Sequence, residues 1–403
     1  IQGISQSISH WTRSSPDAGS VARDGADAIR AARSLNGQIA TLVLPANTAW
    51  DTADSPVQCA DMAALHRPGA AEIEASAKAL TLPGAALLVG GTALFGAHRW
   101  FAGQIAAKTG CRLMADTLIP RISKGAGEPV MAQLPYPVPP KIEMLRETTS
   151  ITLVGTDRPV AFFAYPNTPS LPEQPGCTIT SLCRAEMDIG WTLQALADAV
   201  GVSGEDQPQT YALDVPALPD GAITLDKIGA ALANLLPENA IVCNEAVTSG
   251  FQVVPPMTTA QPHDMLGGTG GAIGWSLPGA VGAAVACPDR KIAVLTGDGS
   301  AMYTLQSLWT MAREGLDVTV VVFANRGYQI LRNELLNVGV QSFGENAQAM
   351  FDVEQPELDW VALAKGHGVP GSRADDMGSF VKAFQAGVSQ DGPSLIEVAC
   401  PPA

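Results

Sequence analysis

The clearest candidates for chemistry are an acidic residue, Asp298, and an amide, Asn325, each of which follows an apolar run. A carboxylate and an amide oxygen suit a hard cation such as Mg²⁺, which also takes phosphate oxygens as ligands. Gly297 and Gly299 flank the acid and would let the backbone approach a diphosphate closely. A helix beginning near Ser300 would direct backbone N–H groups at that anion. Because Asp298 alone would repel a diphosphate, the pattern predicts a metal ion between the two.

Two expected strands and one expected helix must position these side chains. Lys291–Thr296 is an apolar run that ends just before the Gly-Asp-Gly-Ser segment, and Val318–Ala324 is rich in β-branched residues. Between them, Met302–Glu314 has a helical pattern. In a right-handed βαβ unit the carboxyl ends of both strands lie at the same sheet edge. Gly-Asp-Gly alone indicates only a tight turn, but within this unit the spacing favours a site where Asp298 and Asn325 converge.

Strands and helices alternate along much of the chain, which predicts an α/β fold with doubly wound parallel sheets. We expect three domains, at residues 1–60, 65–210 and 221–403. The first contains a single αβ unit, too little to bury its own core, so it resembles the end of a larger domain. The polar, proline-rich stretch Glu205–Asp220 suits a linker between the second and third.

The middle segment offers weaker signals. Gly90, Gly91 and Gly96 follow an expected strand, and their spacing favours a plain strand-to-helix turn over a nucleotide-binding loop. Val160–Phe163 is predicted to be a strand. The aromatic residues at its end and at Tyr165 are expected to pack in a core in preference to forming a substrate wall.

Bulk composition limits the possible function classes. Apolar residues make up 46% and charged residues 16% of the chain, which excludes global disorder. The net charge of −15 disfavours nucleic acid and anionic membranes as partners. Leu266–Cys287 is uncharged, but its glycines and Pro278 favour a turn and a buried helix over a membrane span. The scattered cysteines and the lack of a signal-peptide pattern predict a cytoplasmic protein.

Residues 291–328 resemble the thiamin-diphosphate motif, which begins with Gly-Asp-Gly and ends with Asn. The wider chain resembles the family of acetolactate synthase, benzoylformate decarboxylase and pyruvate oxidase. This resemblance implies thiamin diphosphate and Mg²⁺ as cofactors. It implies that the Asp298 and Asn325 side chains and the Gly327 backbone carbonyl bind the metal, and that Ser300 contacts the diphosphate.

A second matching segment lies upstream. Gly270–Gly274 and the Leu-Pro pair that follows resemble the family's turn that holds the aminopyrimidine ring. Gly271 would contact that ring through its backbone. Ile273 would be the bulky apolar residue that bends the two cofactor rings together. Without the surrounding glycines, it would be expected to be an ordinary core isoleucine. The bend would bring the 4′-imino nitrogen of the pyrimidine ring close to C2 of the thiazolium ring, from which it must remove a proton.

Two further segments resemble cofactor-facing parts of the family. Asn244–Ser249 follows an expected strand, and within it Thr248 is a candidate for a diphosphate contact. Glu245 is left with two interpretations, an exposed carboxylate or an interface residue. Four residues follow the metal loop, where relatives place substrate-facing residues: Gln329, Ile330, Leu331 and Leu335. Ordinary helix packing explains the three apolar ones equally well.

The resemblance implies decarboxylation of a 2-oxo acid with carboligation, as in acetolactate synthase. A simple 2-oxo acid decarboxylase and a non-catalytic cofactor-binding protein stay open as alternatives, and the 2-oxo acid is not identified. The family's activating glutamate is expected in an N-terminal segment that precedes this chain, so no catalytic residue is assigned within it. The middle segment lacks the family's FAD signature, so FAD is not expected. The family's shared sites imply a homodimer or homotetramer.

Overall fold

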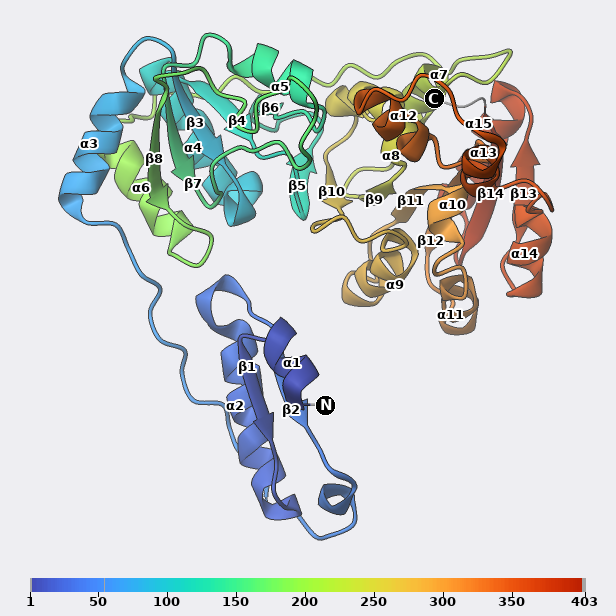
Figure 1. The fold of residues 1–403 in the computed structure, drawn as a ribbon, viewed down its shortest axis with the longest axis horizontal. Helices are drawn as coiled ribbons and strands as arrows, with labels where there is room; N and C mark the ends of the chain where they lie inside the picture. Colours follow the sequence, from blue (N-terminus) through green and yellow to red (C-terminus); the bar gives the residue numbers. More distant parts are fainter. Residues whose placement is uncertain (1, 54, 401–403) are drawn as a thin grey trace.

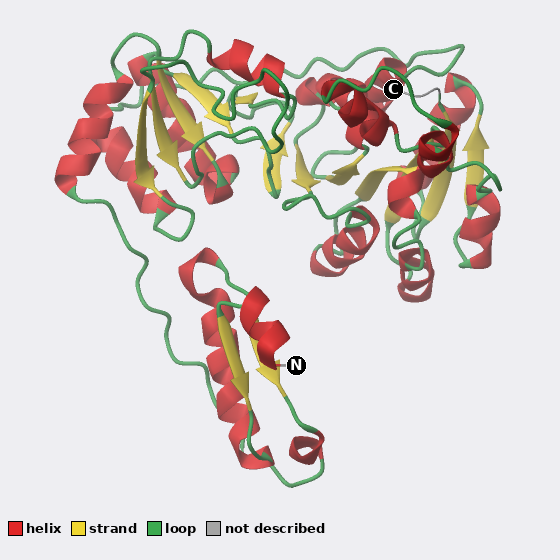
Figure 2. Cartoon of the chain, viewed as in Figure 1, coloured by secondary structure: helices red, strands yellow, loops and turns green. Residues whose placement is uncertain are grey.

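The computed structural model describes residues 2–53 and 55–400. These residues form three sheets of two, five and seven strands. The strands pair in parallel, apart from one antiparallel pair in the largest sheet. Helices cover both faces of the seven-stranded sheet (Figure 2). The predicted α/β fold with doubly wound parallel sheets is therefore confirmed.

The N-terminal unit is small and stands apart from the two larger sheets (Figure 1). Its two parallel strands pack against one amphipathic helix, and Arg13 binds Asp24 and Asp27 of that helix at 2.9 and 2.6 Å. Asn36 donates hydrogen bonds to the carbonyl oxygens of Ala185 and Met187 in the middle segment. The elements are α1 (Gln2–Ile8), β1 (Trp11–Ser14), α2 (Val21–Arg33) and β2 (Ala40–Val43).

The middle segment builds a five-stranded parallel sheet in the order β6-β4-β3-β7-β8. Its central strand β3 is fully buried, as expected for a continuous apolar run between helix layers. The elements are α3 (Ala70–Leu80), β3 (Ala85–Val89), α4 (Gly96–Thr109), β4 (Arg112–Ala115), β6 (Ala132–Gln133), α5 (Val138–Leu145), β7 (Ser150–Val154), β8 (Thr178–Cys183) and α6 (Ile189–Ala199).

The C-terminal segment forms most of the seven-stranded sheet, ordered β13-β14-β12-β11-β9-β10-β5. Its strands are β9 (Ile241–Glu245), β10 (His263–Gly267), β11 (Ile292–Gly297), β12 (Val318–Ala324), β13 (Gly371–Ala374) and β14 (Ser394–Ala399). Its helices are α7 (Leu225–Leu235), α8 (Val247–Val253), α9 (Ser276–Ala286), α10 (Asp298–Ala301), α11 (Ser307–Glu314), α12 (Gln329–Asn337), α13 (Glu345–Phe351), α14 (Trp360–Gly366) and α15 (Met377–Ser389).

Strand β12 shows how this sheet is buried on both faces. Val320 and Val322 belong to one apolar cluster, with α9, α11 and α14, while Val321 and Phe323 belong to another, with α7 and α15. This alternation is the two-residue period of a strand. Figure 1 shows α9, α11 and α14 together on one side of the sheet. Two buried layers fix the strands rigidly, so the loops at their carboxyl ends are held in place.

The predicted domains are not wholly separate. Strand β5 (Arg121–Lys124) lies in the middle segment, yet it pairs antiparallel with β10 and forms the edge of the C-terminal sheet. Arg121 donates to both oxygens of Asp264 across this junction. This pairing ties the second and third predicted domains together. The domain boundaries at residues 60, 65, 210 and 221 remain proposals.

One predicted strand is wrong, and one predicted helix is confirmed over Ser307–Glu314 but starts later than expected. Val160–Phe163 is irregular, and Phe162 and Phe163 are 43% and 55% exposed, so the expected core packing fails as well. The helix predicted at Met302–Glu314 begins only at Ser307. Within the described residues, no helix is long and apolar enough to cross a membrane.

Candidate functional site

The predicted site residues gather in a small pocket at the carboxyl edge of the large sheet. The chain leaves β9 towards β10 on one side and leaves β11 towards β12 on the other, so a crevice opens between β9 and β11. Ligands of open α/β sheets bind at such switch points. The pocket, here called the switch-point pocket, is lined by Ala246, Val247, Thr248, Ser249, Ile273, Gly297, Asp298, Gly299, Ser300, Asn325, Gly327, Tyr328, Gln329 and Ile330.

Eight of the nine predicted cofactor residues line this pocket, and Gly271 does not. Ala246, Val247 and Ser249 also line the pocket; they belong to the cofactor-facing segment Asn244–Ser249, in which Thr248 alone is predicted as a contact. Tyr328 lines the pocket although no prediction included it. Val247 has a φ of 46°, which is strained for a β-branched residue. Its position beside the pocket could not be read from its residue type. The roles of all these residues towards a cofactor remain predictions.

Asp298 lines the pocket and is 3% exposed. Its Oδ1 accepts a hydrogen bond from the Gly299 N–H at 2.8 Å, and its Oδ2 accepts one from the Arg326 N–H at 2.7 Å. The second bond joins the end of β11 to the loop after β12, so the two strand ends converge as the βαβ argument predicts. Burial raises the pKa of Asp298 to about 6, while the two backbone donors act in the opposite direction.

This shift predicts how stability depends on pH in metal-free buffer. The pKa of Asp298 is about 6 in the folded chain against an ordinary value of 3.8. Between pH 3.8 and about pH 6, Asp298 is therefore mostly protonated in the folded chain and mostly ionised in the unfolded chain. Lowering the pH from 7 to 4 should therefore stabilise the wild type, by up to roughly 3 kcal/mol, relative to Asp298→Ala. Urea unfolding of both proteins at several pH values measures the difference. A difference that does not change with pH would contradict the burial of a charged carboxylate.

Asn325 and Gly327 form a tight loop after β12. The Asn325 Oδ1 accepts from the Gly327 N–H at 3.3 Å, and Arg326 between them has a left-handed φ of 58°. A Cβ on Gly327 would lie 3.2 Å from the Phe351 carbonyl oxygen and 2.8 Å from Nη1 of Arg332, so the loop packs closely against its neighbours there. The Tyr328 N–H donates to the Phe351 carbonyl at 2.8 Å and holds the loop from outside. The amide oxygen and the loop backbone are thus fixed beside Asp298.

This donor set fits Mg²⁺. It offers one carboxylate, one amide oxygen and a backbone carbonyl, all hard oxygen ligands. Within residues 2–53 and 55–400, no group of three or more His, Cys, Asp or Glu side chains could hold a metal. Mg²⁺ commonly binds through one or two carboxylates and takes its other ligands from phosphates and water. The set therefore suits a metal that arrives with a diphosphate.

The segment after Asp298 differs from the predicted continuous helix. Helix α10 is a single turn, and the N–H groups of Tyr303 and Thr304 bond three residues back, to Ser300 and Ala301. These tight i→i+3 bonds end the α-helical pattern before α11 begins. A one-turn helix has little macrodipole, so close backbone contact is a better reason for an anion to bind here than a long helix dipole.

The glycine turn between β10 and α9 is open. Gly270 and Gly271 have left-handed φ values of 74° and 70°, and a Cβ on either would meet no atom within 4 Å. Ile273 is 41% exposed, which excludes the interpretation as a core isoleucine. An exposed isoleucine beside the pocket is available to a ligand. Gly271 lies in the same glycine turn, but it is not among the residues that line the pocket.

The interpretation of Glu245 as an exposed carboxylate is wrong, because the residue is 6% exposed and its carboxylate accepts from the N–H groups of Gly274 and Ser276. The interpretation as an interface residue stays a prediction. The sequence could not show this, since the contact joins residues far apart along the chain. The glutamate therefore belongs to the support of the glycine turn.

The middle-segment glycines favour the plain turn. A Cβ on Gly90 would lie 2.6 Å from the Gly155 carbonyl oxygen, and one on Gly155 would lie 2.8 Å from Cδ1 of Ile189. Neither Gly90 nor Gly155 has room for a side chain. The close approach of two strand ends and α6 explains the glycines.

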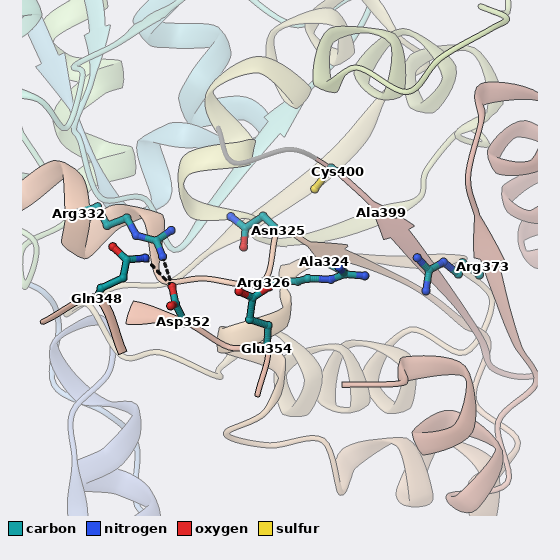
Figure 3. A pocket seen from close by; sticks show the side chains of 10 residues that line it. All are labelled: Ala324, Asn325, Arg326, Arg332, Gln348, Asp352, Glu354, Arg373, Ala399 and Cys400. Atoms are coloured by element: carbon teal, nitrogen blue, oxygen red, sulfur yellow. Dashed lines mark hydrogen bonds and ion pairs between the residues drawn. The ribbon is translucent and has the colours of Figure 1, made fainter. Parts of the chain in front are cut away.

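A larger cavity of about 630 Å³ lies beside the Asn325 loop (Figure 3). Three arginines contribute to its wall, and each is paired with a carboxylate. Arg326 pairs with Glu357, Arg332 with Asp352, and Arg373 with Asp375. Because these charges are already neutralised, the cavity attracts an anion less than its arginines suggest.

Comparison with known proteins agrees with this geometry. Residues 247–398 match the model of the thiamine pyrophosphate enzyme, C-terminal TPP binding domain. The whole chain is 38% identical to a Mycobacterium tuberculosis protein named "Putative acetolactate synthase large subunit IlvX" and covers 77% of its length. Benzoylformate decarboxylase of Pseudomonas aeruginosa is 29% identical over 52% of this chain and 39% of its own.

Among solved structures, the fold is similar to a thiamine diphosphate-dependent 4-hydroxybenzoylformate decarboxylase of Rhodococcus jostii. The TM-score is 0.79 at 22% identity, over 98% of this chain and 76% of that one. Benzoylformate decarboxylase of Polynucleobacter necessarius gives a TM-score of 0.78 at 19% identity. At such identities the likeness establishes the fold alone.

Proposed function

The chain belongs to the family of thiamine pyrophosphate-dependent enzymes that includes acetolactate synthase and the 2-oxo acid decarboxylases, and on that premise we propose that it decarboxylates a 2-oxo acid and joins the product to an acceptor. One observation carries the proposal. The switch-point pocket brings Asp298, Asn325 and Gly327 together with Thr248 and Ile273, from three separate loops and the glycine turn. These are the residue types that a metal, a diphosphate and a ring system require.

In this proposal each group of lining residues binds one part of the cofactor. Asp298, Asn325 and the Gly327 carbonyl hold Mg²⁺, and Ser300 and Thr248 contact the diphosphate. Thiamin diphosphate, when bound, supplies the electron sink for loss of CO₂. Ile273 supports the bent arrangement of the two rings, and Gly271 contributes its backbone. The largely buried strands β9, β11 and β12 behind these loops hold each group in place and limit reorganisation.

The activating glutamate is proposed to come from outside the residues that line the switch-point pocket. Glu245, the glutamate that reaches the turn beside the pocket, has both oxygens engaged by backbone N–H groups. In the described part of the chain, Asp298 is the one carboxylate among the lining residues, and it is assigned to the metal. Protonation of the pyrimidine ring is therefore assigned to a glutamate elsewhere, on the same polypeptide or on a partner.

A second copy of the chain is the proposed partner. The switch-point pocket encloses only about 40 Å³, enough for an ion and its waters but not for two rings. Exposed apolar residues lie on or next to the segments that line it, and they are Val247, Phe251, Ile273, Tyr303 and Leu331. Apolar rims of this kind mark interaction sites. A homodimer or homotetramer would cover the rings and bury this rim.

The partner proposal predicts the effect of a charge on the rim. Phe251→Glu should shift the native mass towards the 41.7 kDa monomer, because the glutamate would be buried unpaired in the interface. Val285, which is 64% exposed at the far end of α9, gives the control Val285→Glu. Light scattering after size-exclusion chromatography measures the mass. Equal masses for both variants would place the interface elsewhere.

Product analysis tests the reaction. With Mg²⁺, thiamin diphosphate and pyruvate alone, the proposal predicts CO₂ and acetolactate, identified by NMR. A simple decarboxylase is the second candidate, favoured by the sequence match to benzoylformate decarboxylase over half of the chain. It would release acetaldehyde from pyruvate, or benzaldehyde from benzoylformate. Cofactor binding without CO₂ from any 2-oxo acid, even with the activating glutamate supplied, would point to the non-catalytic alternative.

Two further parts of the proposal concern cofactors and location. The proposed cofactor set does not include FAD, because the middle segment lacks the family's FAD signature. The seven cysteines, all within the described residues, are free thiols, and this supports a reducing compartment such as the cytoplasm.

A further inference from the structure

A buried glutamate fixes one end of the glycine turn. Glu245 ends β9, and its Oε1 accepts from the Gly274 N–H at 2.5 Å while its Oε2 accepts from the Ser276 N–H at 3.0 Å. Ser276 is the first residue of α9, so the carboxylate satisfies one of the N–H groups that a helix leaves unpaired at its start. Both oxygens are engaged and the residue is 6% exposed, so the contact is protected from water.

The same point of the turn is held from a second side. The Thr304 Oγ1 donates to the Gly274 carbonyl at 2.6 Å. Gly274 has a left-handed φ of 82°, and a Cβ there would lie 2.6 Å from Cβ of Tyr303. Its N–H, its carbonyl and its Cα hydrogens are thus all in contact with neighbouring elements. Gly274 is a fixed point, in contrast to the open glycines at 270 and 271.

We infer that Glu245 is a positioning residue that sets where Ile273 and the glycine turn stand against the cofactor rings. Ile273 immediately precedes the fixed point and lines the switch-point pocket, so its Cα is placed by the bonds to Gly274. The metal loop is held separately, by Arg326 N–H to Asp298 and by Tyr328 N–H to Phe351. Glu245 should therefore govern contacts to the rings and leave the metal and diphosphate end unaffected. The inference rests on the proposed function.

The test compares two probes that share the diphosphate but not the rings. Calorimetry measures the affinity of the full chain for thiamin diphosphate and for inorganic diphosphate, each with Mg²⁺. Glu245→Gln keeps the side-chain size but sets an amide NH₂ against one backbone N–H donor. Thiamin diphosphate should bind about tenfold more weakly or worse, and inorganic diphosphate should bind as in the wild type. Glu238→Gln, exposed just before the same strand, is the matched control.

Thr304→Val gives a second route if Glu245→Gln fails to fold, as monitored by thermal unfolding. It removes the bond to the Gly274 carbonyl at nearly constant volume and should show the same selective loss. Equal weakening of both probes, or of neither, in the folded variants would overturn the positioning role. A wild type that binds inorganic diphosphate but not thiamin diphosphate would overturn the proposed function and the inference with it.

Discussion

Asp298→Ala is expected to abolish Mg²⁺-dependent binding of thiamin diphosphate while the chain stays folded. Asp298 is the carboxylate of the proposed ligand set, and without it the metal has only neutral oxygens from the protein. The affinity should fall by about a hundredfold or more, which corresponds to roughly 3 kcal/mol. The fold should persist because the variant removes a buried charge whose pKa is raised to about 6 by burial. Calorimetric titrations with and without Mg²⁺ measure the effect.

Asp289→Ala is the matched control for this variant. Asp289 is exposed and lies just before β11, at the opposite end of the strand from Asp298. The control should bind the cofactor as tightly as the wild type. Unchanged, metal-dependent affinity in Asp298→Ala would mean that the metal is held elsewhere, and the site assignment would fail.

Gly274→Ala should have the second largest effect, on both stability and cofactor binding. The new Cβ would meet Cβ of Tyr303 at 2.6 Å and would also be held at a left-handed φ of 82°. Left-handed backbone costs about 1–2 kcal/mol for alanine, and overpacking adds about 1–3 kcal/mol. We expect a loss of about 3 kcal/mol in the free energy of unfolding, together with weaker binding of thiamin diphosphate.

Gly271→Ala separates the two causes. Gly271 has a similar φ of 70°, but a Cβ there would meet open space. Its variant should lose only about 1 kcal/mol, the backbone contribution alone. Urea unfolding of both variants gives the comparison. Equal losses would show that the contact with Tyr303 relaxes freely, and Gly274 would then not be a fixed point.

The parts of the fold that were predictable are those with strong local signals. The strand predicted at Val318–Ala324 is β12, because a strand buried on both faces is a continuous β-branched run bounded by polar residues. The convergence of Asp298 with the loop after β12 followed from the handedness of βαβ units. The gathering of Thr248 and Ile273 in the same pocket was expected from the family resemblance, not from residue patterns.

The features that were missed depend on contacts between distant residues. β5 is an edge strand of four residues whose partner, β10, lies far along the chain. The break before Ser307 arises from bonds made three residues back, which helix periodicity does not reveal. The buried role of Glu245 follows from its two bonds to the glycine turn. A carboxylate after a strand looks the same in sequence whether it faces water or backbone donors.

The most direct test of the account is a crystal structure of the full chain with thiamin diphosphate and Mn²⁺ in place of Mg²⁺. Anomalous scattering locates the Mn²⁺ independently of any prior assignment. We expect one ion in the switch-point pocket, which the Asp298 carboxylate, the Asn325 amide oxygen and the Gly327 carbonyl would hold. An ion in the arginine-lined cavity beside the Asn325 loop, or a diphosphate bound without any ion near Asp298, would contradict it.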